Sequence, residues 1–508
     1  MLVKVCSVSN SGLKTIGIEV EVNVASRGLP ALEIVGLPSK AVAESKERVK
    51  TAIVNSQLSF PQRRIIINLA PADVPKEGSC YDLPIAVGIL SSGLECGLPQ
   101  RSLFFGELSL DGSLRHTKGA LLLALFAKEN DFVNVFVPKA SANEAAIVKG
   151  VNVYPVESLN QLIKHFSGLI QIMPTEYRES SQDKFDAEFN MSEVLGQEQA
   201  KRALEISAAG GHNFLMVGSP GAGKTMLARA LPGILPPLSE KESLEVTKIF
   251  SASGRIPPEG SLVRTRPFRA PHHTVSQVGL TGGGTKPQPG EISLAHRGVL
   301  FLDEFNEFPR SVLEALRQPM EDGRLTISRS QQRVEYPARF ILAASANPCP
   351  CGYLDHPKRA CLCTEREIEK YRKRVSGPLL DRIDLHIKVP VVDIEELARF
   401  EPLKKRQTTS DEIRVRVIQA RQVQQERFSE DGIHTNAEMK NKQIAKYCVL
   451  SKPVKQLLVQ AGQKFHLSAR SYYKMVKVAR TIADLDKSDE INIAHMAEAL
   501  QYRLRIKL

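Results

Sequence analysis

A glycine-rich octapeptide constrains this chain more than any other segment. Residues 218–225 read Gly-Ser-Pro-Gly-Ala-Gly-Lys-Thr, a complete G-x-x-x-x-G-K-T phosphate-loop pattern. It follows an apolar stretch at 213–217 and precedes a helix-like stretch at 226–231, the strand–loop–helix context that such a loop requires. In this context backbone N–H groups surround phosphate oxygens, the lysine neutralises the terminal phosphates and the threonine hydroxyl binds Mg²⁺. The residues predicted to bind ATP and Mg²⁺ are Gly218, Pro220, Gly221, Ala222, Gly223, Lys224 and Thr225.

A second motif predicts hydrolysis as well as binding. The apolar run from Val299 to Leu302 is typical of a buried parallel strand, and it ends in Asp303 and Glu304. Asp303 is expected to hold Mg²⁺ and Glu304 to polarise the attacking water. Another apolar strand ends at Asn347, whose amide is suited to orient that water. The alternative is a pair of core strands that end in incidental acids.

Length and composition narrow the class of protein. A chain of 508 residues exceeds one hydrophobic core, so two or three domains are expected. The 68 Lys and Arg residues outnumber the 56 Asp and Glu residues, and this excess suits a polyanionic partner without establishing one. The chain has no signal-peptide pattern and no run of about eighteen apolar residues. We therefore expect a cytoplasmic protein without a membrane partner.

The pattern along the chain predicts an α/β protein of several parts. Residues 1–170 alternate strand-like and helical stretches and predict an α/β domain, and residues 171–190 have the polar, aperiodic composition of a linker. The nucleotide-binding α/β core is expected at 191–389. Residues 390–508 are almost wholly helix-like and predict a helical domain.

Further motifs carry a family resemblance. They are Val-Leu-Gly-Gln-Glu-Gln-Ala at 194–200, Phe-Arg-Ala-Pro-His-His-Thr at 268–274, Gly-Gly-Gly at 282–284 before Glu-Ile at 291–292, Leu-Arg-Gln-Pro-Met-Glu-Asp-Gly at 316–323, and Asn-Pro-Cys-Pro-Cys-Gly at 347–352. Together they make the chain similar, over essentially its whole length, to the ComM/YifB-type, magnesium-chelatase-like AAA+ ATPases. The resemblance implies an AAA+ P-loop core, an N-terminal Lon-protease-like domain and a C-terminal helical lid.

The resemblance also implies roles for single residues. Gly196 and Gln197 would lie near the adenine, and Asn347 would be the sensor 1 residue. Arg382 would be an arginine finger and Arg470 the sensor 2 arginine, both stabilising charge on the transferred phosphoryl group. A finger supplied by a neighbouring subunit implies a homo-hexameric ring. The alternative for Arg382 is a surface ion pair with Asp381 or Asp384.

Two insertions are predicted to contact DNA. One spans roughly residues 267–289 and is too long for an ordinary connection, and the other is a hairpin at 324–336. By resemblance they are the helix-2 insert and the pre-sensor-1 hairpin. Lys286, Arg329 and Arg333 are the cations expected near phosphates, where contacts are sequence-tolerant and salt-sensitive. The alternative is that they are solvated loop charges.

Four cysteines predict a metal site. Cys349, Cys351, Cys361 and Cys363 form two C-x-C pairs, and four thiolates suit a tetrahedral structural Zn²⁺ site. The pairs depart from the usual spacing of two or more intervening residues. His356 or Asp355 could replace one of the thiolates.

The resemblance implies a hexameric ATP-dependent DNA helicase or translocase. It would promote branch migration when incoming DNA recombines during natural transformation, with single-stranded and branched DNA and recombination proteins as partners. One alternative is a magnesium-chelatase motor subunit for metal insertion. The other is an ATP-dependent peptidase with a Cys80–Lys118 dyad, although Tyr81 and Asp82 replace the small residues of active Lon enzymes.

Overall fold

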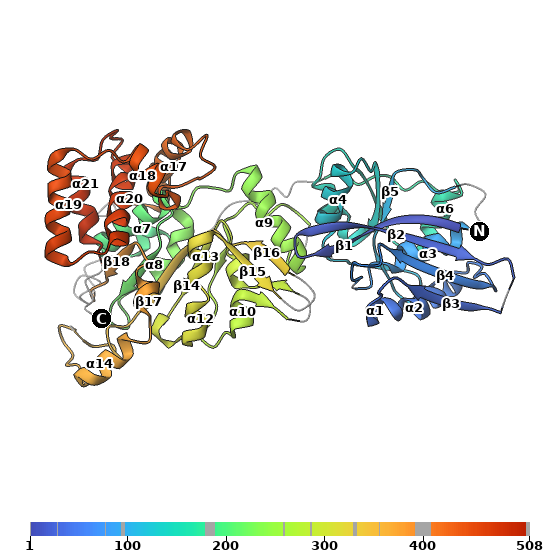
Figure 1. Cartoon of the computed structure of the whole chain (residues 1–508), viewed down its shortest axis with the longest axis horizontal. Coiled ribbons are helices and arrows are strands. Elements are labelled where there is room, and N and C mark those ends of the chain that lie inside the picture. Colours follow the sequence, from blue (N-terminus) through green and yellow to red (C-terminus); the bar gives the residue numbers. More distant parts are fainter. Residues whose placement is uncertain are drawn as a thin grey trace.

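The computed structural model describes residues 2–27, 29–76, 78–92, 97–177, 188–257, 260–284, 287–328, 333–354, 356–391 and 408–503. It is elongated, with an N-terminal lobe (2–177), a central lobe (188–391) and C-terminal helices (408–503) arranged along its long axis (Figure 1). Lys286 and Arg329, which are predicted to contact DNA, and Asp355, the alternative metal ligand, lie outside the described residues. Within the described residues, no helix combines the length and the apolar character needed to cross a membrane.

The N-terminal lobe is built on a seven-stranded mixed sheet of order β3-β4-β2-β1-β5-β8-β9. Strands β2 and β4 alternate buried and more exposed side chains, so one of their faces packs on helices, whereas β5 and β8 are buried almost throughout. The strands are β1 (Leu2–Ser11), β2 (Lys14–Val24), β3 (Ala31–Val35), β4 (Arg64–Ala70), β5 (Ser102–Phe104), β8 (Asn134–Pro138) and β9 (Asn152–Val156), and β6 (Glu107–Leu108) pairs separately with β7 (Leu114–Arg115). The helices are α1 (Lys40–Ala43), α2 (Ser45–Asn55), α3 (Asp82–Ser91), α4 (Ala120–Glu129), α5 (Lys139–Ala146) and α6 (Leu159–Phe166).

The central lobe contains a five-stranded parallel sheet of order β11-β14-β17-β10-β18. Strands β14 and β17 are buried along their whole length, which explains why their sequences are continuous apolar runs. The strands are β10 (Phe214–Val217), β11 (Phe268–Arg269), β14 (Val299–Leu302), β17 (Ile341–Ala346) and β18 (Leu385–Lys388). The helices are α7 (Glu198–Gly210), α8 (Lys224–Ala230), α9 (Glu240–Ser253), α10 (Gln277–Thr281), α11 (Glu291–Leu294), α12 (Arg310–Glu314), α13 (Arg317–Asp322), α14 (Glu365–Arg372) and α15 (Gly377–Leu380).

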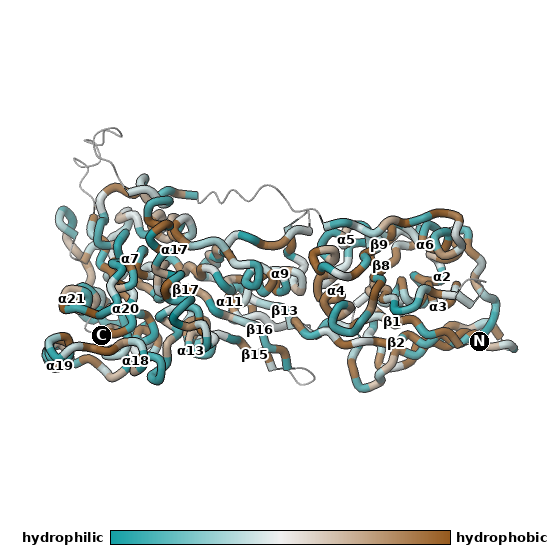
Figure 2. The backbone as a smooth tube through the Cα atoms, turned by 90° about the horizontal axis from the view of Figure 1, so that it is seen from above, coloured by the Kyte–Doolittle hydropathy of each residue, from teal (hydrophilic) through white to brown (hydrophobic). Residues whose placement is uncertain are grey.

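Two small hairpins extend from the central lobe. Strands β12 (Gly282–Gly283) and β13 (Gln288–Pro289) pair within the first predicted insertion. Strands β15 (Arg324–Ser328) and β16 (Arg333–Pro337) form the second, so the hairpin predicted at 324–336 is confirmed. In Figure 1 and in the orthogonal view of Figure 2, β15 and β16 lie on the side of the central lobe that faces β1 and β2.

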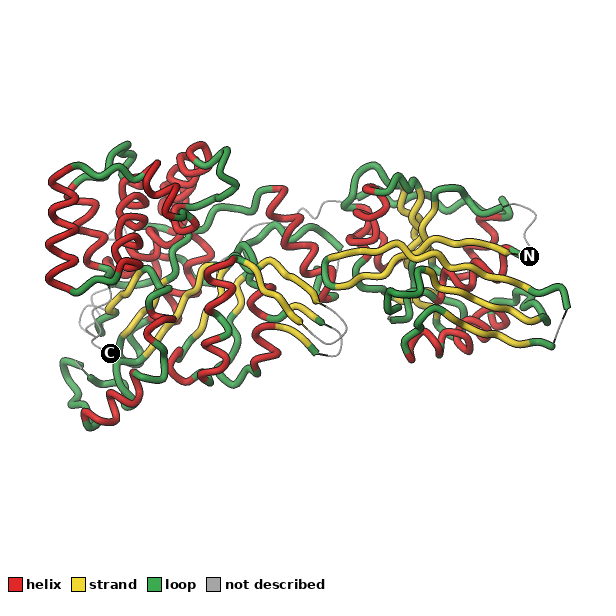
Figure 3. The backbone as a smooth tube through the Cα atoms, in the orientation of Figure 1, coloured by secondary structure: helices red, strands yellow, loops and turns green. Residues whose placement is uncertain are grey.

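The C-terminal region is helical in the part that the structure describes, as predicted (Figure 3). Its α-helices are α17 (Ser410–Arg427), α18 (Asn441–Tyr447), α19 (Lys452–Phe465), α20 (Ala469–Leu485) and α21 (Ile493–Gln501). Apolar side chains of α17 and α20 belong to the same buried cluster as those of α7 and β10. The helices therefore share one hydrophobic core with the central lobe.

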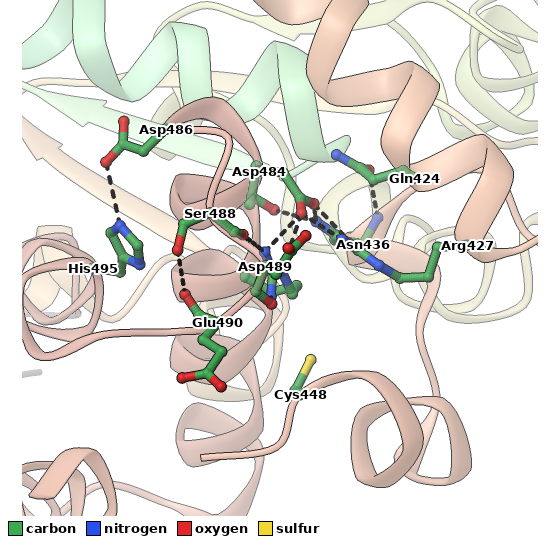
Figure 4. Close-up of polar contacts among 12 residues, drawn as sticks. Gln424, Arg427, Asn436, Cys448, Asp484, Asp486, Ser488, Asp489, Glu490 and His495 are labelled. Carbon is green, nitrogen blue, oxygen red and sulfur yellow. Dashed lines mark hydrogen bonds and ion pairs between the residues drawn. The ribbon is translucent and has the colours of Figure 1, made fainter. Parts of the chain in front are cut away.

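A buried polar cluster fixes these helices to one another (Figure 4). The Asp484 carboxylate is fully buried and accepts hydrogen bonds from Arg427, Arg480 and Asn436. Thr481, one turn earlier on α20, contacts His212 Nε2 at 2.8 Å, and His212 Nδ1 lies 3.3 Å from Asp384 of the central lobe. The polar network thus joins the helices to the segment just before β18.

Candidate functional site

The phosphate loop has the predicted strand–loop–helix context, because β10 ends at Val217 and α8 begins at Lys224. Gly221 and Gly223 have φ of 77° and 86°, backbone geometry that favours glycine. The Lys224 Nζ donates to the Gly218 carbonyl at 2.6 Å and to Asn347 Oδ1 at 3.1 Å. Burial lowers the pKa of Lys224, although Asp303 and Glu304 oppose this shift. The lysine is therefore held beside the loop that it is predicted to serve.

Asp303 and Thr225, the two residues predicted to hold Mg²⁺, contact each other. The Thr225 Oγ1 donates to Asp303 Oδ2 at 2.8 Å, and the Ser345 hydroxyl donates to Asp303 Oδ1. Strands β14, β17 and β10 are neighbours in one parallel sheet, so their carboxyl ends bring Asp303, Asn347 and the phosphate loop to the same edge. A hydroxyl and a carboxylate oxygen are ligands that Mg²⁺ prefers, so these residues fit the ion. Ser345 was missed by sequence reasoning because a serine within an apolar strand carries no distinctive signal.

Glu304 is contacted by a residue that sequence reasoning had not assigned. Its backbone has a positive φ of 52° and its side chain is 54% exposed. The His273 Nδ1 lies 3.2 Å from Glu304 Oε2. His273 belongs to the Pro-His-His-Thr segment noted above, and this motif was the available signal. His273 and Glu304 lie close together because they follow β11 and β14, which are paired parallel strands.

Gln197, which is predicted to lie near the adenine, contacts the phosphate loop. Its Nε2 donates to the Pro390 carbonyl at 2.6 Å and to the Ala222 carbonyl at 3.4 Å. Gly196 and Gln197 both have left-handed backbones, with φ of 62° and 58°. These contacts place the turn before α7 between the phosphate loop and the end of β18.

Arg382 and Arg470 meet on one carboxylate, that of Glu321 at the end of α13. Arg470 lies 3.3 Å from Glu321 Oε1, and Arg382 pairs with Oε2. Hydrogen bonding from Arg382, followed by the charges of both arginines, lowers the pKa of Glu321. Within the part of the chain that the structure describes, neither arginine forms a hydrogen bond or ion pair with Lys224 or Asp303 of the same chain. The observed partner of Arg382 is Glu321, rather than the Asp381 or Asp384 considered as its surface partner.

Arg333 is the predicted DNA contact that lies within the described residues. It is exposed at the start of β16, opposite Ser328 in the hairpin register. Tyr336 of the same strand donates from its hydroxyl to the Pro287 carbonyl at 2.8 Å, so the hairpin contacts the first insertion. The two insertions therefore form one surface feature.

Four cysteine thiols converge after β17. The Sγ atoms of Cys349, Cys351, Cys361 and Cys363 all lie within 4.8 Å of one another, with Cys349–Cys351 and Cys351–Cys361 separations of 3.4 and 3.5 Å. Zn–S bonds of about 2.3 Å place tetrahedral sulfurs about 3.8 Å apart, so the cluster fits a structural Zn²⁺ ion. Backbone N–H groups of Tyr353 and Leu362 lower the pKa of Cys351 to about 6, which favours the thiolate that a metal binds. Burial and the neighbouring cysteines raise the pKa values of Cys361 and Cys363.

The cysteine loop packs directly on the phosphate loop. A Cβ added at Gly352 would lie 2.6 Å from Pro220 Cδ. His356, the suggested alternative ligand, accepts a hydrogen bond from the Lys358 N–H through Nδ1 at 3.1 Å. The four thiols thus make the candidate metal set, adjacent to the nucleotide site.

The Cys80–Lys118 pair of the peptidase alternative is not brought together by the described contacts. Cys80 is buried in the hydrophobic core of the N-terminal lobe. The Lys118 side chain instead covers Gly254 of the central lobe, where an added Cβ would lie 2.6 Å from Lys118 Cδ. Lys118 is therefore an inter-lobe contact.

Comparisons with known proteins agree with this architecture. Residues 190–397 match a family described as magnesium chelatase, subunit ChlI, residues 20–141 match subunit ChlI of Mg-chelatase, and residues 407–503 match the ChlI C-terminal family. Competence protein ComM of Haemophilus influenzae is 40% identical over 99% of this chain and 98% of its own length. The uncharacterized protein YifB of Escherichia coli is 40% identical over 97% of this chain and 95% of its own. The magnesium-chelatase 38 kDa subunit of Rhodobacter capsulatus is 28% identical over 32% of this chain and 50% of its own.

Proposed function

The chain belongs to the ComM/YifB-type, magnesium-chelatase-like AAA+ proteins, and we propose that it is a hexameric, ATP-dependent DNA helicase or translocase of the cytoplasm. It promotes branch migration when incoming DNA recombines during natural transformation, on single-stranded and branched DNA and together with recombination proteins. The observation that carries the proposal is the cluster of Lys224, Thr225, Asp303 and Asn347 at one sheet edge, with Glu304 beside it.

The positions of these residues support the following roles. Lys224 binds the terminal phosphates, while Thr225 and Asp303 hold Mg²⁺, which neutralises phosphate charge when it is bound. Glu304 polarises the water that Asn347 orients. Gly196 and Gln197 bind the adenine end of ATP. Arg382 pairs with Glu321 rather than with this cluster of its own chain, and we assign it to the site of a neighbouring subunit in a ring, with Arg470 as the sensor 2 arginine.

DNA is proposed to contact the two insertions. Lys286, Arg329 and Arg333 bind backbone phosphates, and the exposed position of Arg333 on β16 supports this role. Such contacts do not depend on base sequence, as translocation along a strand requires.

The cysteine cluster is proposed to hold structural zinc through Cys349, Cys351, Cys361 and Cys363. The convergence of four sulfurs supports this assignment. Zn²⁺ would cross-link a loop that has little secondary structure of its own and keep it against Pro220.

A magnesium-chelatase motor has less support, because the matching chelatase subunit covers only 32% of the chain. An ATP-dependent peptidase has even less support, because Lys118, the proposed partner of Cys80, packs on Gly254. Casein degradation by the wild type and by Cys80→Ser provides the direct check of the latter.

The proposal is tested by the ATPase rate as a function of protein concentration, without DNA and with single-stranded or branched DNA. We expect specific activity to rise with concentration as rings form, and to rise further with DNA. Glu304→Gln should retain ATP binding and ring formation while turnover falls about 10²–10⁴-fold, the usual worth of general-base catalysis. A monomer with full activity that ignores every polynucleotide would overturn the proposal.

A further inference from the structure

The turn between β1 and β2 of the N-terminal lobe packs against the β15–β16 hairpin of the central lobe (Figures 1 and 2). Leu13, in this turn, packs against Ile327, Val334 and Tyr336 of the hairpin. These three side chains are 8%, 3% and 1% exposed and form a hydrophobic cluster separate from the larger cores. An element of the N-terminal lobe therefore covers the apolar face of the element that we assign to DNA binding.

A hairpin of this size needs packing against another element to be stable. It is a separate two-stranded sheet with five residues in each strand, and isolated two-stranded hairpins are marginally stable in water. Leu325, near its base, packs into the core of the central lobe. Ile327 and Val334, which face each other nearer the tip, pack instead with Leu13. The outer half of the hairpin thus takes its support from the N-terminal lobe.

The contact at the turn is close. Gly12 has a φ of 63°, and an added Cβ would lie 2.1 Å from Val334 Cγ1 and 3.3 Å from the Tyr336 hydroxyl oxygen. No L-amino-acid side chain fits there unless the Val334 side chain of the hairpin moves. Because the Tyr336 hydroxyl also donates to the Pro287 carbonyl, a displacement at Gly12 reaches the first insertion as well.

A second contact anchors the N-terminal lobe, so the turn is not a free arm. The Ser251 hydroxyl at the end of α9 donates to Glu144 Oε1 at 2.6 Å, and Glu144 is 3% exposed. Lys118 covers Gly254 immediately after α9. The lobe therefore contacts the central lobe both at α9 and at the hairpin.

We propose that the N-terminal lobe is a support for the β15–β16 hairpin, that Gly12 and Leu13 are its positioning residues, and that this contact couples polynucleotide binding to ATP hydrolysis. The coupling rests on the proposed DNA-driven function, whereas the support of the hairpin does not. Loss of the contact loosens the outer half of the hairpin and reduces the stimulation of hydrolysis by DNA. Hydrolysis without DNA is unchanged, because neither residue contacts the nucleotide cluster.

The first test compares Gly12→Ala with Gly168→Ala in the full-length protein. Gly168 is also in the N-terminal lobe and has a φ of 72°, but an added Cβ would meet nothing within 4 Å. Both variants carry the same backbone strain, and only Gly12→Ala pushes on the hairpin. We expect Gly12→Ala to lower DNA stimulation by roughly five-fold or more, as overpacking of a close contact does, while Gly168→Ala behaves as the wild type.

A rescue variant and a second substitution keep the test independent of misfolding. Val334→Ala removes the methyl group that Gly12→Ala would strike, so the double variant should recover stimulation relative to Gly12→Ala alone. Leu13→Ser should reduce stimulation, whereas Leu29→Ser, at a residue that is 87% exposed, should not. Equal stimulation in Gly12→Ala, Leu13→Ser and the wild type would overturn the coupling.

Hydrogen exchange of the hairpin amides separates the two proposals. We expect faster exchange in 324–328 and 333–337 for Gly12→Ala and Leu13→Ser, with or without DNA, and unchanged exchange for their controls. Unchanged exchange in both variants would overturn the support of the hairpin. A wild type that no polynucleotide stimulates would overturn the proposed function and the coupling, while the exchange data would still decide the support.

Discussion

The His273 Nδ1 lies 3.2 Å from Glu304 Oε2, so an imidazole from the segment after β11 holds the carboxylate that follows β14. The same segment belongs to the first insertion, whose Pro287 carbonyl accepts a hydrogen bond from Tyr336 of the β15–β16 hairpin. His273 therefore contacts a carboxylate oxygen that Glu304 needs as a general base. The histidine itself belongs to an insertion that we assign to DNA binding.

His273→Ala is expected to raise ATP hydrolysis in the absence of DNA. Removal of the imidazole frees the Glu304 carboxylate to polarise water, and a pair of this exposure is worth about 1 kcal/mol or less, so the gain should be at most about five-fold. Steady-state ATPase assays without DNA measure it. His272→Ala is the matched control, because His272 Nδ1 contacts Thr274 Oγ1 instead. A lower rate in His273→Ala would instead assign the histidine a role in supporting hydrolysis.

Mixing two inactive variants should restore activity. Arg382→Ala keeps an intact phosphate loop, and Lys224→Ala keeps an intact arginine that it can offer to a neighbour. A mixed ring then contains sites with both wild-type residues, so the ATPase rate of the mixture should exceed that of either variant alone. Titration of one variant into the other at fixed total concentration measures this. Absence of recovery at every ratio would place Arg382 outside the neighbour's site.

Arg333→Ala is expected to weaken DNA binding through phosphate contacts. The slope of log affinity against log salt should fall by about one, because one fewer counterion is released. Fluorescence anisotropy with single-stranded DNA at several salt concentrations gives this slope. Arg324→Ala is the control, since Arg324 lies at the hairpin base and pairs with Glu335 at 3.5 Å. An unchanged slope for Arg333→Ala would count against its assignment.

Cys361→Ser is expected to remove zinc. The purified wild type should contain about one zinc per chain, and the variant should retain almost none after dialysis, because three thiolates remain for a four-coordinate site. Atomic emission spectroscopy measures the metal. The ATPase KM should rise as well, since the cysteine loop packs on Pro220. Cys6→Ser, in the N-terminal lobe, should change neither quantity.

Asp484→Asn is expected to destabilise the C-terminal helices. The substitution leaves Arg427 and Arg480, which are 14% and 3% exposed, without their buried counter-charge, at a cost of about 3–5 kcal/mol. Urea unfolding followed by circular dichroism should show a lower midpoint. Asp486→Asn removes a charge whose side chain is 47% exposed, and its midpoint should stay near that of the wild type. Equal midpoints would show that the buried cluster is not needed for stability.

Local patterns were enough to identify the nucleotide-binding chemistry. The phosphate loop and the Asp303–Glu304 pair each follow a continuous apolar strand, so strand, turn and functional group are encoded in neighbouring residues. The hairpin at 324–336 and the helices after 408 were predictable for the same reason. The cysteine pairs likewise revealed a candidate metal set, because thiol spacing is visible without a fold.

Local sequence patterns therefore specified the kind of chemistry and the elements that carry it. The contacts between distant residues become visible only in the folded chain: His273 with Glu304, Arg382 and Arg470 with Glu321, and Leu13 with the hairpin. Each of these contacts joins residues far apart in the chain. They depend on strand order, on helix packing and on the docking of two lobes, and a periodic pattern within one element records none of these.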